Sequence, residues 1–178
     1  MIEPSDEPEL IEKARHDPEA FAELYRRYLS PVYRYLYRRL GNIHEAEDLT
    51  AQVFIDVLEG LIADHYRASG YFSAWLFTIA RRRLVDFYRQ RPPLQLDENH
   101  SSEPGLLVAL EKSDDLQRLS SLLSELDEEK QELLRLRFSA GLGFAEIAQL
   151  EGRSEPAVKM ALYRALDWLR EHWDVENG

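Results

Sequence analysis

Hydrophobic residues return every three or four positions along most of this 178-residue chain, which is the spacing of one face of an α-helix. The alternating runs bounded by turn pairs that mark β-strands and hairpins are missing. The pattern therefore predicts an all-α protein. We expect a short helix after Ser5 and further helices over residues 17–41, 42–62, 72–91, 127–138, 144–150 and 155–171.

Capping and turn residues mark the ends of these helices. Asp17 followed by Pro18 is a typical helix start, and Gly41 is a typical helix end. Asn42, with a glutamate three positions later, resembles a capping box for the next helix. Pro31 lies inside the second helix, where we expect it to restart or kink the helix.

Prolines and acidic residues separate the helices into two groups. A proline pair stops the fourth helix, and residues 92–105 combine prolines, small polar residues and acids. We therefore expect two small helical domains, residues 1–91 and 116–178, joined by a flexible acidic linker over residues 92–115.

Composition narrows the classes of function. The chain has no cysteine, which excludes disulfides, thiolate zinc sites and cysteine nucleophiles. No apolar run approaches the roughly 18 residues of a membrane span, and the first residues are acidic where a signal peptide is basic. We expect a soluble, cytoplasmic protein that does not insert into a membrane.

The net charge of −11 argues at first against nucleic acid, because DNA binding is driven largely by cations that displace phosphate counterions. The distribution of the charge changes this picture. Residues 71–91 contain five arginines and a single acidic residue, Asp86. A basic helix is therefore expected within an acidic protein, and nucleic acid remains a candidate partner.

Residues 144–164 carry the spacing of a helix-turn-helix. Ala148 is small enough for two helices to cross closely, Gly152 supplies the turn, and Val158 is placed to pack on the first helix. Ser154 is expected to cap the second helix, whose amide end can face a phosphate or base edges. An ordinary helical hairpin with solvated charges is the alternative for this segment alone.

Motifs for catalysis are missing. His44 lies among acidic residues, but this segment has neither the two histidines of a metalloprotease helix nor the paired Glu-x-x-His sets of a di-iron bundle. The other histidines are scattered, and there is no glycine-rich phosphate loop. We expect no enzymatic activity, no catalytic residue, no cofactor and no metal.

Three segments, in the right order and at the right separations, resemble a known family. Residues 47–54 (EDLTAQVF) resemble the polymerase-binding helix of bacterial sigma factors, residues 72–81 (FSAWLFTIAR) their promoter-melting helix, and residues 123–170 their carboxy-terminal promoter domain. The size and the two-domain layout are similar to the extracytoplasmic-function (ECF) group. The resemblance implies a factor that binds core RNA polymerase, recognises the minus-thirty-five and minus-ten promoter elements and nucleates strand opening.

The first candidate site is a polymerase-docking helix. The resemblance implies that the helix with Asp48, Leu49, Gln52 and Phe54 binds a coiled coil of the largest core subunit. Leu49 and Phe54 are five positions apart, so we expect at least one of them on the flank of the helix as an apolar contact. The alternative is that both are core residues and the acids form a solvated face.

The second candidate site binds the minus-ten element. Holding an opened strand calls for aromatic platforms, a pocket for an extruded base and cations for the backbone. The resemblance implies that residues 63–72 hold a flipped base and that Trp75 faces the fork, although packing is an equal alternative for Trp75. The expected contacts are Tyr66, Arg67, Tyr71, Trp75, Arg81 and Arg82, whereas Phe72, Leu76 and Ile79 are expected to pack.

The third candidate site binds the minus-thirty-five element. The sequence departs here from the family pattern at Met160, where a small hydroxyl residue is common, and at Gly143, where Ser or Thr is the frequent cap. The family's DNA contacts map to Arg137, ahead of the helix pair, and to Lys159, Met160, Tyr163 and Arg164 on its second helix.

The resemblance also implies the partners. They are core RNA polymerase, promoter DNA as duplex and as melted strand, and an anti-sigma factor of the kind that often clamps both domains. In related factors the linker enters the channel that later carries RNA, where acids could imitate phosphates; a solvated linker is the alternative. The competing interpretation of the whole chain is a dimeric repressor or activator that binds its operator without polymerase.

Overall fold

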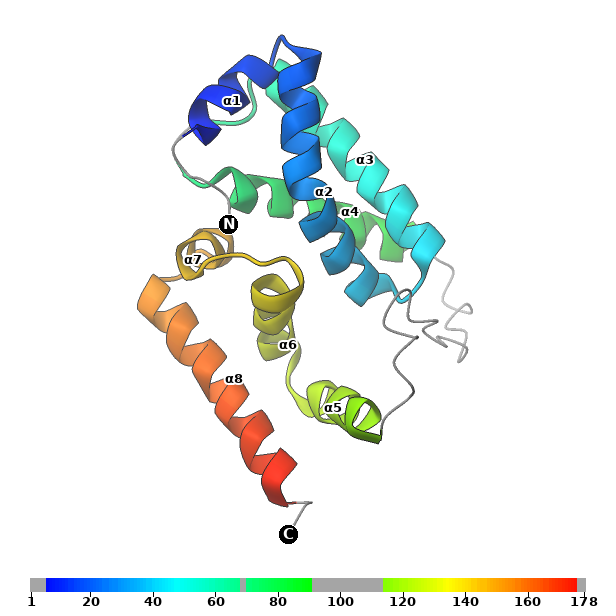
Figure 1. The fold of residues 1–178 in the computed structure, drawn as a ribbon, viewed down its shortest axis with the longest axis vertical. Coiled ribbons are helices and arrows are strands. Elements are labelled where there is room, and N and C mark those ends of the chain that lie inside the picture. The colour runs from blue at the N-terminus through cyan, green and yellow to red at the C-terminus, as the bar shows by residue number, and fades with distance from the viewer. Residues whose placement is uncertain (1–5, 68–69, 91–113, 176–178) are drawn as a thin grey trace. The chain divides into compact units, whose positions relative to one another are not determined.

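The computed structural model describes residues 6–67, 70–90 and 114–175, and every regular element in these ranges is a helix. The prediction of an all-α fold is confirmed. The helices divide into two compact units, one that contains α1 to α4 and one that contains α5 to α8 (Figure 1). Within the described ranges, none of the helices combines the length and the apolar character that crossing a membrane requires.

The first unit consists of α1 (Glu7–Ala14), α2 (Pro18–Leu40), α3 (Ile43–Ile62) and α4 (Phe72–Gln90). Helices α2 and α3 run side by side, α1 packs on α2, and α4 crosses both α3 and α2 (Figure 1). Because α3 has neighbours on two sides, a broad part of its surface is buried. The core of the unit includes Ile11, Leu24, Val32, Leu36, Val53, Leu61, Leu76 and Leu84.

Polar caps and a glycine set the ends of α2 and α3, as predicted. The Asp17 carboxylate accepts a hydrogen bond from the Glu19 amide at 2.9 Å, and the Asn42 side chain accepts one from the Glu45 amide at 3.1 Å. Gly41 ends α2 in the left-handed conformation, with a φ of 68°. These local interactions explain why the predicted boundaries lie within a residue or two of the observed ones.

Helix α2 continues through Pro31, so the expected restart of this helix does not occur. A proline removes one N–H group from the helical hydrogen bonds. Tyr28 and Val32, on either side of Pro31, are both buried, and so are Leu24 and Tyr35 further along. Both halves of the helix are therefore held against the same core, and this packing outweighs the lost hydrogen bond.

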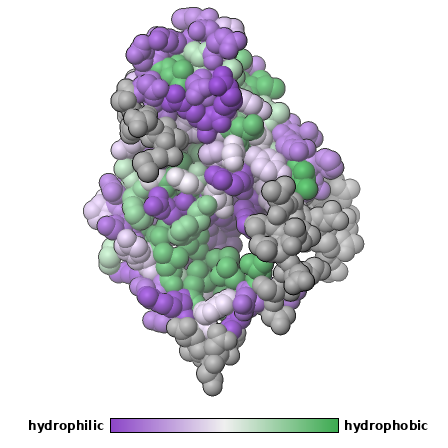
Figure 2. Space-filling model, in the orientation of Figure 1, coloured by the Kyte–Doolittle hydropathy of each residue, from purple (hydrophilic) through white to green (hydrophobic). Residues whose placement is uncertain are grey.

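The second unit contains α5 (Asp114–Glu125), α6 (Glu128–Leu134), a π-helical turn η1 (Arg135–Ser139), α7 (Phe144–Glu151) and α8 (Glu155–Val175). Helix α8 packs on α5, α6 and α7. Figure 2 shows an apolar patch on this unit, where partly buried hydrophobic residues surround the core. The core includes Leu122, Leu126, Leu133, Leu136, Ile147, Val158, Leu162 and Ala165.

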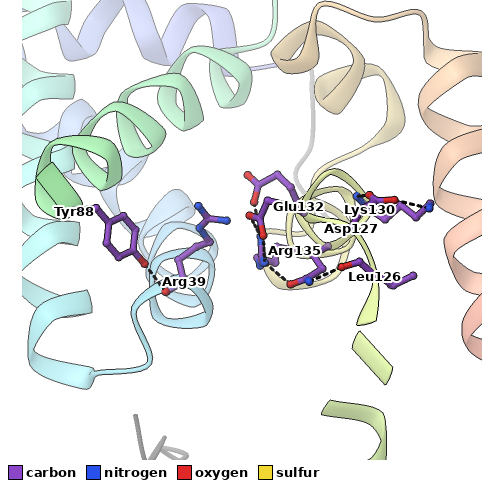
Figure 3. A network of polar contacts seen from close by, with 9 residues as sticks. Arg39, Tyr88, Leu126, Asp127, Lys130, Glu132 and Arg135 are labelled. Carbon is purple, nitrogen blue, oxygen red and sulfur yellow. Dashed lines mark hydrogen bonds and ion pairs between the residues drawn. The ribbon is translucent and has the colours of Figure 1, made fainter. Parts of the chain in front are cut away.

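Short polar contacts fix the start of α6 (Figure 3). The Asp127 carboxylate accepts a hydrogen bond from the Lys130 amide at 2.9 Å and pairs with the Lys130 ammonium group at 2.5 Å. This hydrogen bond from the ammonium group lowers the pKa of Asp127. Arg135 pairs with Glu132 at 3.0 Å and so connects α6 to the π-helical turn that follows.

Helix α5 begins at Asp114, inside the range predicted as linker. The acidic residues Asp97, Glu98, Glu103 and Glu111 lie outside the described residues. The linker and its imitation of phosphates therefore stay predictions.

Candidate nucleic-acid interface

Trp75 lies where α4 crosses α3. Its ring packs against the rings of Tyr66 and Phe72, with centroids 5.2 and 5.6 Å away. Gly60 of α3 lies so close that a Cβ atom there would come within 2.9 Å of the Trp75 ring. Trp75 is nevertheless only half-buried. Part of the ring therefore packs while part stays accessible, and the two interpretations of Trp75 are compatible.

Tyr66 is buried, at 6% exposure, so the direct contact with a DNA strand that we predicted for it is not available in this conformation. Its hydroxyl donates a hydrogen bond to the Gly70 carbonyl at 3.2 Å, and its ring lies edge-on to Phe72 at 5.4 Å. Burial raises the pKa of the Tyr66 phenol. Tyr66 therefore contacts Gly70 and the start of α4 from within the core.

Three predicted contacts of the first unit are exposed. Arg67 and Tyr71 lie in the segment between α3 and α4, and Arg82 lies on α4. Arg81 is half-buried. The unit therefore presents cations and an aromatic ring to solvent near Trp75, which are the groups that bind a single strand.

Arg83, which is not among the predicted contacts, fixes α4 against α3. Its guanidinium group donates two hydrogen bonds to the Asp56 carboxylate, and this pairing raises the pKa of Arg83. A cavity of about 690 Å³ opens beside the pair and is also lined by Trp75 and Arg82. It combines an aromatic face, a cation and carboxylate acceptors, a set that can hold a nucleobase by stacking and hydrogen bonding.

A second contact fixes the far end of α4. The Tyr88 hydroxyl donates a hydrogen bond to the Arg39 carbonyl at 2.7 Å (Figure 3). This carbonyl belongs to the last turn of α2, where no helical amide is available to it. Helix α4 is therefore held by polar contacts at Arg83, past its middle, and at Tyr88, near its end.

The predicted docking helix has an apolar surface other than the expected one. Leu49 is 3% exposed and Phe54 is 5% exposed, so both are core residues, and the expectation that one of them lies on the flank is wrong. Positions five residues apart differ by about 140° around a helix. Because α2 and α4 both pack on α3, its buried surface is broad enough to include both side chains.

Asp48 and Gln52 are exposed and begin a stripe along α3. The stripe continues through Ile55, Glu59 and Ile62, and the two isoleucines are 55% and 62% exposed. These positions are three or four residues apart and so share one helical face. We call these five residues the α3 stripe. Ile55 is not among the predicted docking residues, although its spacing of seven from Asp48 was an available signal.

In the second unit α7 and α8 form the predicted helix pair. Gly152 ends α7 with a φ of 62°, and the Ser154 side chain accepts a hydrogen bond from the Ala157 amide at 3.4 Å. Val158 and Ala148 are buried where the two helices pack. The predicted roles of the small residue, the turn and the buried valine are thus confirmed.

The first turns of α8 carry four of the residues that we predict to contact the minus-thirty-five DNA. Two cations, an aromatic ring and a thioether are therefore available to phosphates and base edges on this helix. The exposed residues are Lys159, Met160, Tyr163 and Arg164.

Arg137 has a structural role that the sequence did not indicate. It is half-buried and donates a hydrogen bond to the Leu142 carbonyl at 2.7 Å. Its guanidinium group lies 4.9 Å from the centroid of the Phe144 ring. The Lys159 ammonium group lies 5.9 Å from the same centroid, and the Tyr163 ring lies 6.2 Å away. Phe144 therefore connects Arg137 to two candidate contacts of α8 through cation–π and edge-on ring contacts.

These two surfaces define a class of protein. A helical unit with an aromatic, basic helix and a second unit with an exposed recognition helix are the features of a two-unit DNA-binding protein. No three histidine or carboxylate side chains in the described part of the chain are grouped so that they could hold a metal ion.

Comparisons with known proteins identify the family. The families described as Sigma-70 region 2 and Sigma-70, region 4 match residues 24–92 and 116–169. The ECF RNA polymerase sigma factor BldN of Streptomyces coelicolor is 36% identical, over 89% of this chain and 62% of its own length. The RNA polymerase sigma factor YlaC of Bacillus subtilis is 30% identical, over 83% of this chain and 88% of its own length. The ECF RNA polymerase sigma factor RpoE of Cereibacter sphaeroides is 31% identical, over 88% and 87%.

The chain therefore belongs to the ECF group of RNA polymerase sigma factors, and the predicted family is confirmed. It spans less than two thirds of BldN and almost nine tenths of the other two relatives. Members of this family recognise promoters and initiate transcription with RNA polymerase, so the chain is an initiation factor and not an enzyme.

Solved structures share the fold. The protein CnrH, solved in complex with the cytosolic domain of CnrY, superposes with a TM-score of 0.68 at 24% identity, over 93% of this chain and 96% of the CnrH chain. The sigma factor RpoE of Bartonella quintana, solved with the anti-sigma factor NepR, gives a TM-score of 0.61 at 22% identity, over 87% and 97%. At these identities the likeness concerns the fold alone.

Proposed function

We propose that this chain directs core RNA polymerase to promoters through two separate binding regions, one in each unit. The observation that carries the proposal is that each unit has its own exposed candidate surface. The first unit offers the α3 stripe and the aromatic, basic region of α4, and the second offers the recognition helix α8. These three surfaces differ in chemistry, as binding to protein, to a melted strand and to duplex requires.

The α3 stripe docks on core polymerase. Asp48 and Gln52 provide polar groups and Ile55 provides an apolar contact on the same helical face. Leu49 and Phe54 lie in the core and hold this face in place. Ile55 thus takes the part of the apolar contact that we had expected from Leu49 or Phe54.

The cavity beside Trp75 captures an extruded base of the minus-ten element. The accessible part of the Trp75 ring stacks on the base, while Arg67, Tyr71 and Arg82 bind the neighbouring backbone and bases. Arg81, which is half-buried, supports the same region. Tyr66 contributes by packing against Trp75 and not by touching DNA.

The second unit binds the minus-thirty-five duplex with the first turns of α8. Lys159, Tyr163 and Arg164 contact base edges and phosphates, and Met160 offers an apolar contact. Arg137 also contacts the DNA, and its cation–π contact with the Phe144 ring orients its guanidinium group for this.

The net charge of −11 makes the free chain a weak ligand for DNA. Polymerase supplies positive surface and brings the binding regions of both units to the promoter together. The factor therefore does not bind genomic DNA until it is bound to polymerase. A cytoplasmic location and an anti-sigma factor that covers both units are further parts of this proposal.

Reconstitution with core RNA polymerase tests the proposed function. The holoenzyme should start transcription on genomic DNA at defined sites that share two upstream elements, whereas core polymerase alone should not. Sequencing of the 5′ ends of the transcripts measures this. Absence of shared elements, or failure of the chain to associate with core polymerase, would refute the proposal and favour a conventional repressor.

A further inference from the structure

Helix α1 lies ahead of the region that the Sigma-70 region 2 family covers, which begins at residue 24. It packs on α2 through Ile11 and Ala14, which are both buried. Its start is fastened by two hydrogen bonds from the Arg27 guanidinium group to the Asp6 carboxylate, at 2.9 and 3.0 Å. Helix α1 is therefore a fixed part of the first unit.

Arg15, the residue that follows α1, reaches from the end of this helix to the chain that leaves α3. One of its terminal nitrogens donates a hydrogen bond to the Leu61 carbonyl at 3.4 Å and pairs with the Asp64 carboxylate. The other donates to the Tyr66 carbonyl at 3.2 Å. The Arg15 side chain is only 12% exposed. A single guanidinium group thus joins three acceptors that are distant from it in the sequence.

Each of these acceptors lies where the chain changes direction. Leu61 belongs to the last turn of α3. Asp64 has a left-handed φ of 57°, which is uncommon for a residue other than glycine. Tyr66 is buried beside Trp75. Arg15 therefore holds the path of the chain from α3 to the ring that supports Trp75.

The charges around Arg15 do not favour a direct contact with DNA. Its guanidinium group is paired with Asp64 and lies 3.0 Å from the Glu12 carboxylate. A DNA phosphate would have to displace these carboxylates from a side chain that is largely buried. The arrangement is typical of a group that acts by holding other residues in position.

We propose that Arg15 is a positioning residue for strand capture: it holds residues 61–66 so that the cavity beside Trp75 keeps a shape that accepts an extruded base. This inference rests on the proposed capture of the minus-ten strand by the first unit. It gives α1, which lies outside the matched family region, a part in promoter opening.

The test measures how strongly the holoenzyme depends on single bases of the minus-ten element. Core polymerase with the wild-type chain or a variant binds a fork-junction promoter whose minus-ten strand is single-stranded. Each base of this strand is replaced in turn by an abasic site, and the dissociation constants are compared. For the wild-type chain we expect at least one position where the abasic site weakens binding by roughly ten-fold, because a base stacked on an aromatic ring contributes about this much.

Two substitutions of Arg15 separate geometry from charge. Arg15→Met keeps the length of the side chain and removes its donors, whereas Arg15→Lys keeps the charge but cannot reach three acceptors at once. Both should reduce the effect of the abasic site to below about three-fold, a loss of most of the stacking contribution. Binding to core polymerase and to the minus-thirty-five duplex should stay as in the wild type, which a general loss of folding would not allow.

Two further variants complete the design. Asp64→Asn removes the charged acceptor at an exposed side chain and should reduce the effect in the same direction by a smaller factor. It decides the question if circular dichroism shows that Arg15→Met does not fold. Arg26→Met is the matched control, because Arg26 is an exposed arginine of the same unit that pairs with Glu23 on its own helix. This variant should keep the full effect of the abasic site.

The outcomes distinguish the inference from the proposed function. A wild-type effect of the abasic site in Arg15→Met and in Asp64→Asn would overturn the role of Arg15 and leave strand capture standing. A wild-type effect in Arg15→Lys alone would show that charge suffices, and the proposed three-acceptor geometry would be wrong. If the wild-type chain depends on no base of the strand, strand capture itself is refuted, and the inference with it.

Discussion

The two units present their candidate contacts in different ways. In the second unit the predicted contacts of α8 stand together on the surface of one helix. In the first unit Leu49, Phe54 and Tyr66 are buried, whereas Gln52, Tyr71 and Arg82 are exposed. On α3 the reason is that the helix packs on both α2 and α4, so buried and exposed residues lie within a few positions of each other. In such a unit, an outer layer of exposed side chains contacts the partner, and an inner layer of buried side chains holds the outer layer in position.

Aspartate substitutions in the two layers of α3 should give the largest and clearest contrast. Leu49→Asp places a charge in the core and should destabilise the first unit by about 3 kcal/mol or more. Ile55→Asp places the same charge on the α3 stripe, so the thermal unfolding should be unchanged while co-purification with core polymerase is lost. Circular dichroism and affinity purification measure the two properties.

Either half of this contrast can fail by itself. If Leu49→Asp unfolds at the same temperature as the wild type, Leu49 does not belong to the inner, buried layer. Undiminished recovery of core polymerase with Ile55→Asp would remove the α3 stripe from the proposed docking surface.

Gly60→Ala tests the contact between the layers at Trp75. The new methyl group would come within 2.9 Å of the ring, so the ring must move, at a cost of about 1–3 kcal/mol. We expect slower strand opening, followed by the permanganate reactivity of promoter thymines, with association to core polymerase retained. Adding Trp75→Phe should recover stability because the smaller ring leaves room for the methyl group. Strand opening at the wild-type rate in Gly60→Ala would show that the position of Trp75 does not matter.

Substitutions on α8 should affect binding without affecting folding. Lys159→Ala or Arg164→Ala should weaken holoenzyme binding to the upstream duplex by about 1–3 kcal/mol if the side chain contacts a base edge. Arg170→Ala is the matched control on the same helix, since Arg170 is exposed and pairs with Asp167. Equal losses on cognate and scrambled minus-thirty-five sequences would indicate a phosphate contact, and no loss would remove the residue from the site.

Phe144→Leu should have the smallest effect. It keeps most of the apolar volume but removes the ring that lies 4.9 Å from the Arg137 guanidinium group, and one such cation–π contact contributes about 0.5–1 kcal/mol. We expect a loss of binding to the cognate upstream duplex of roughly two- to five-fold, measured in the same titrations. Unchanged discrimination between cognate and scrambled duplex would reduce Phe144 to a packing residue.

Local signals predicted the elements of this fold well. Asn42 and Gly41 mark a helix start and a helix end because their interactions involve residues three or four positions away. Gly152 and Val158 identify the helix pair because both lie within ten positions of Ala148, on which the pair is packed. Short-range capping and spacing can be followed in a sequence without knowledge of the tertiary structure.

The contacts that shape the candidate site join distant parts of the chain. Arg83 and Asp56 are 27 positions apart, and Arg15 and Tyr66 are 51 positions apart. The periodic spacing of hydrophobic residues does not indicate which distant residues form such pairs. The burial of both Leu49 and Phe54 depends likewise on the number of helices that pack on α3, which its own sequence does not contain.

The central claim is that neither unit binds the promoter strongly by itself, and that core polymerase must bring both units to it. It is tested most directly by a gel-shift titration of one promoter fragment, at physiological salt, with the chain alone, core polymerase alone and both together. We predict a promoter-specific complex only with both, and weak, strongly salt-dependent binding by the chain alone. Promoter-specific binding of the free chain at the strength of the holoenzyme would contradict the claim.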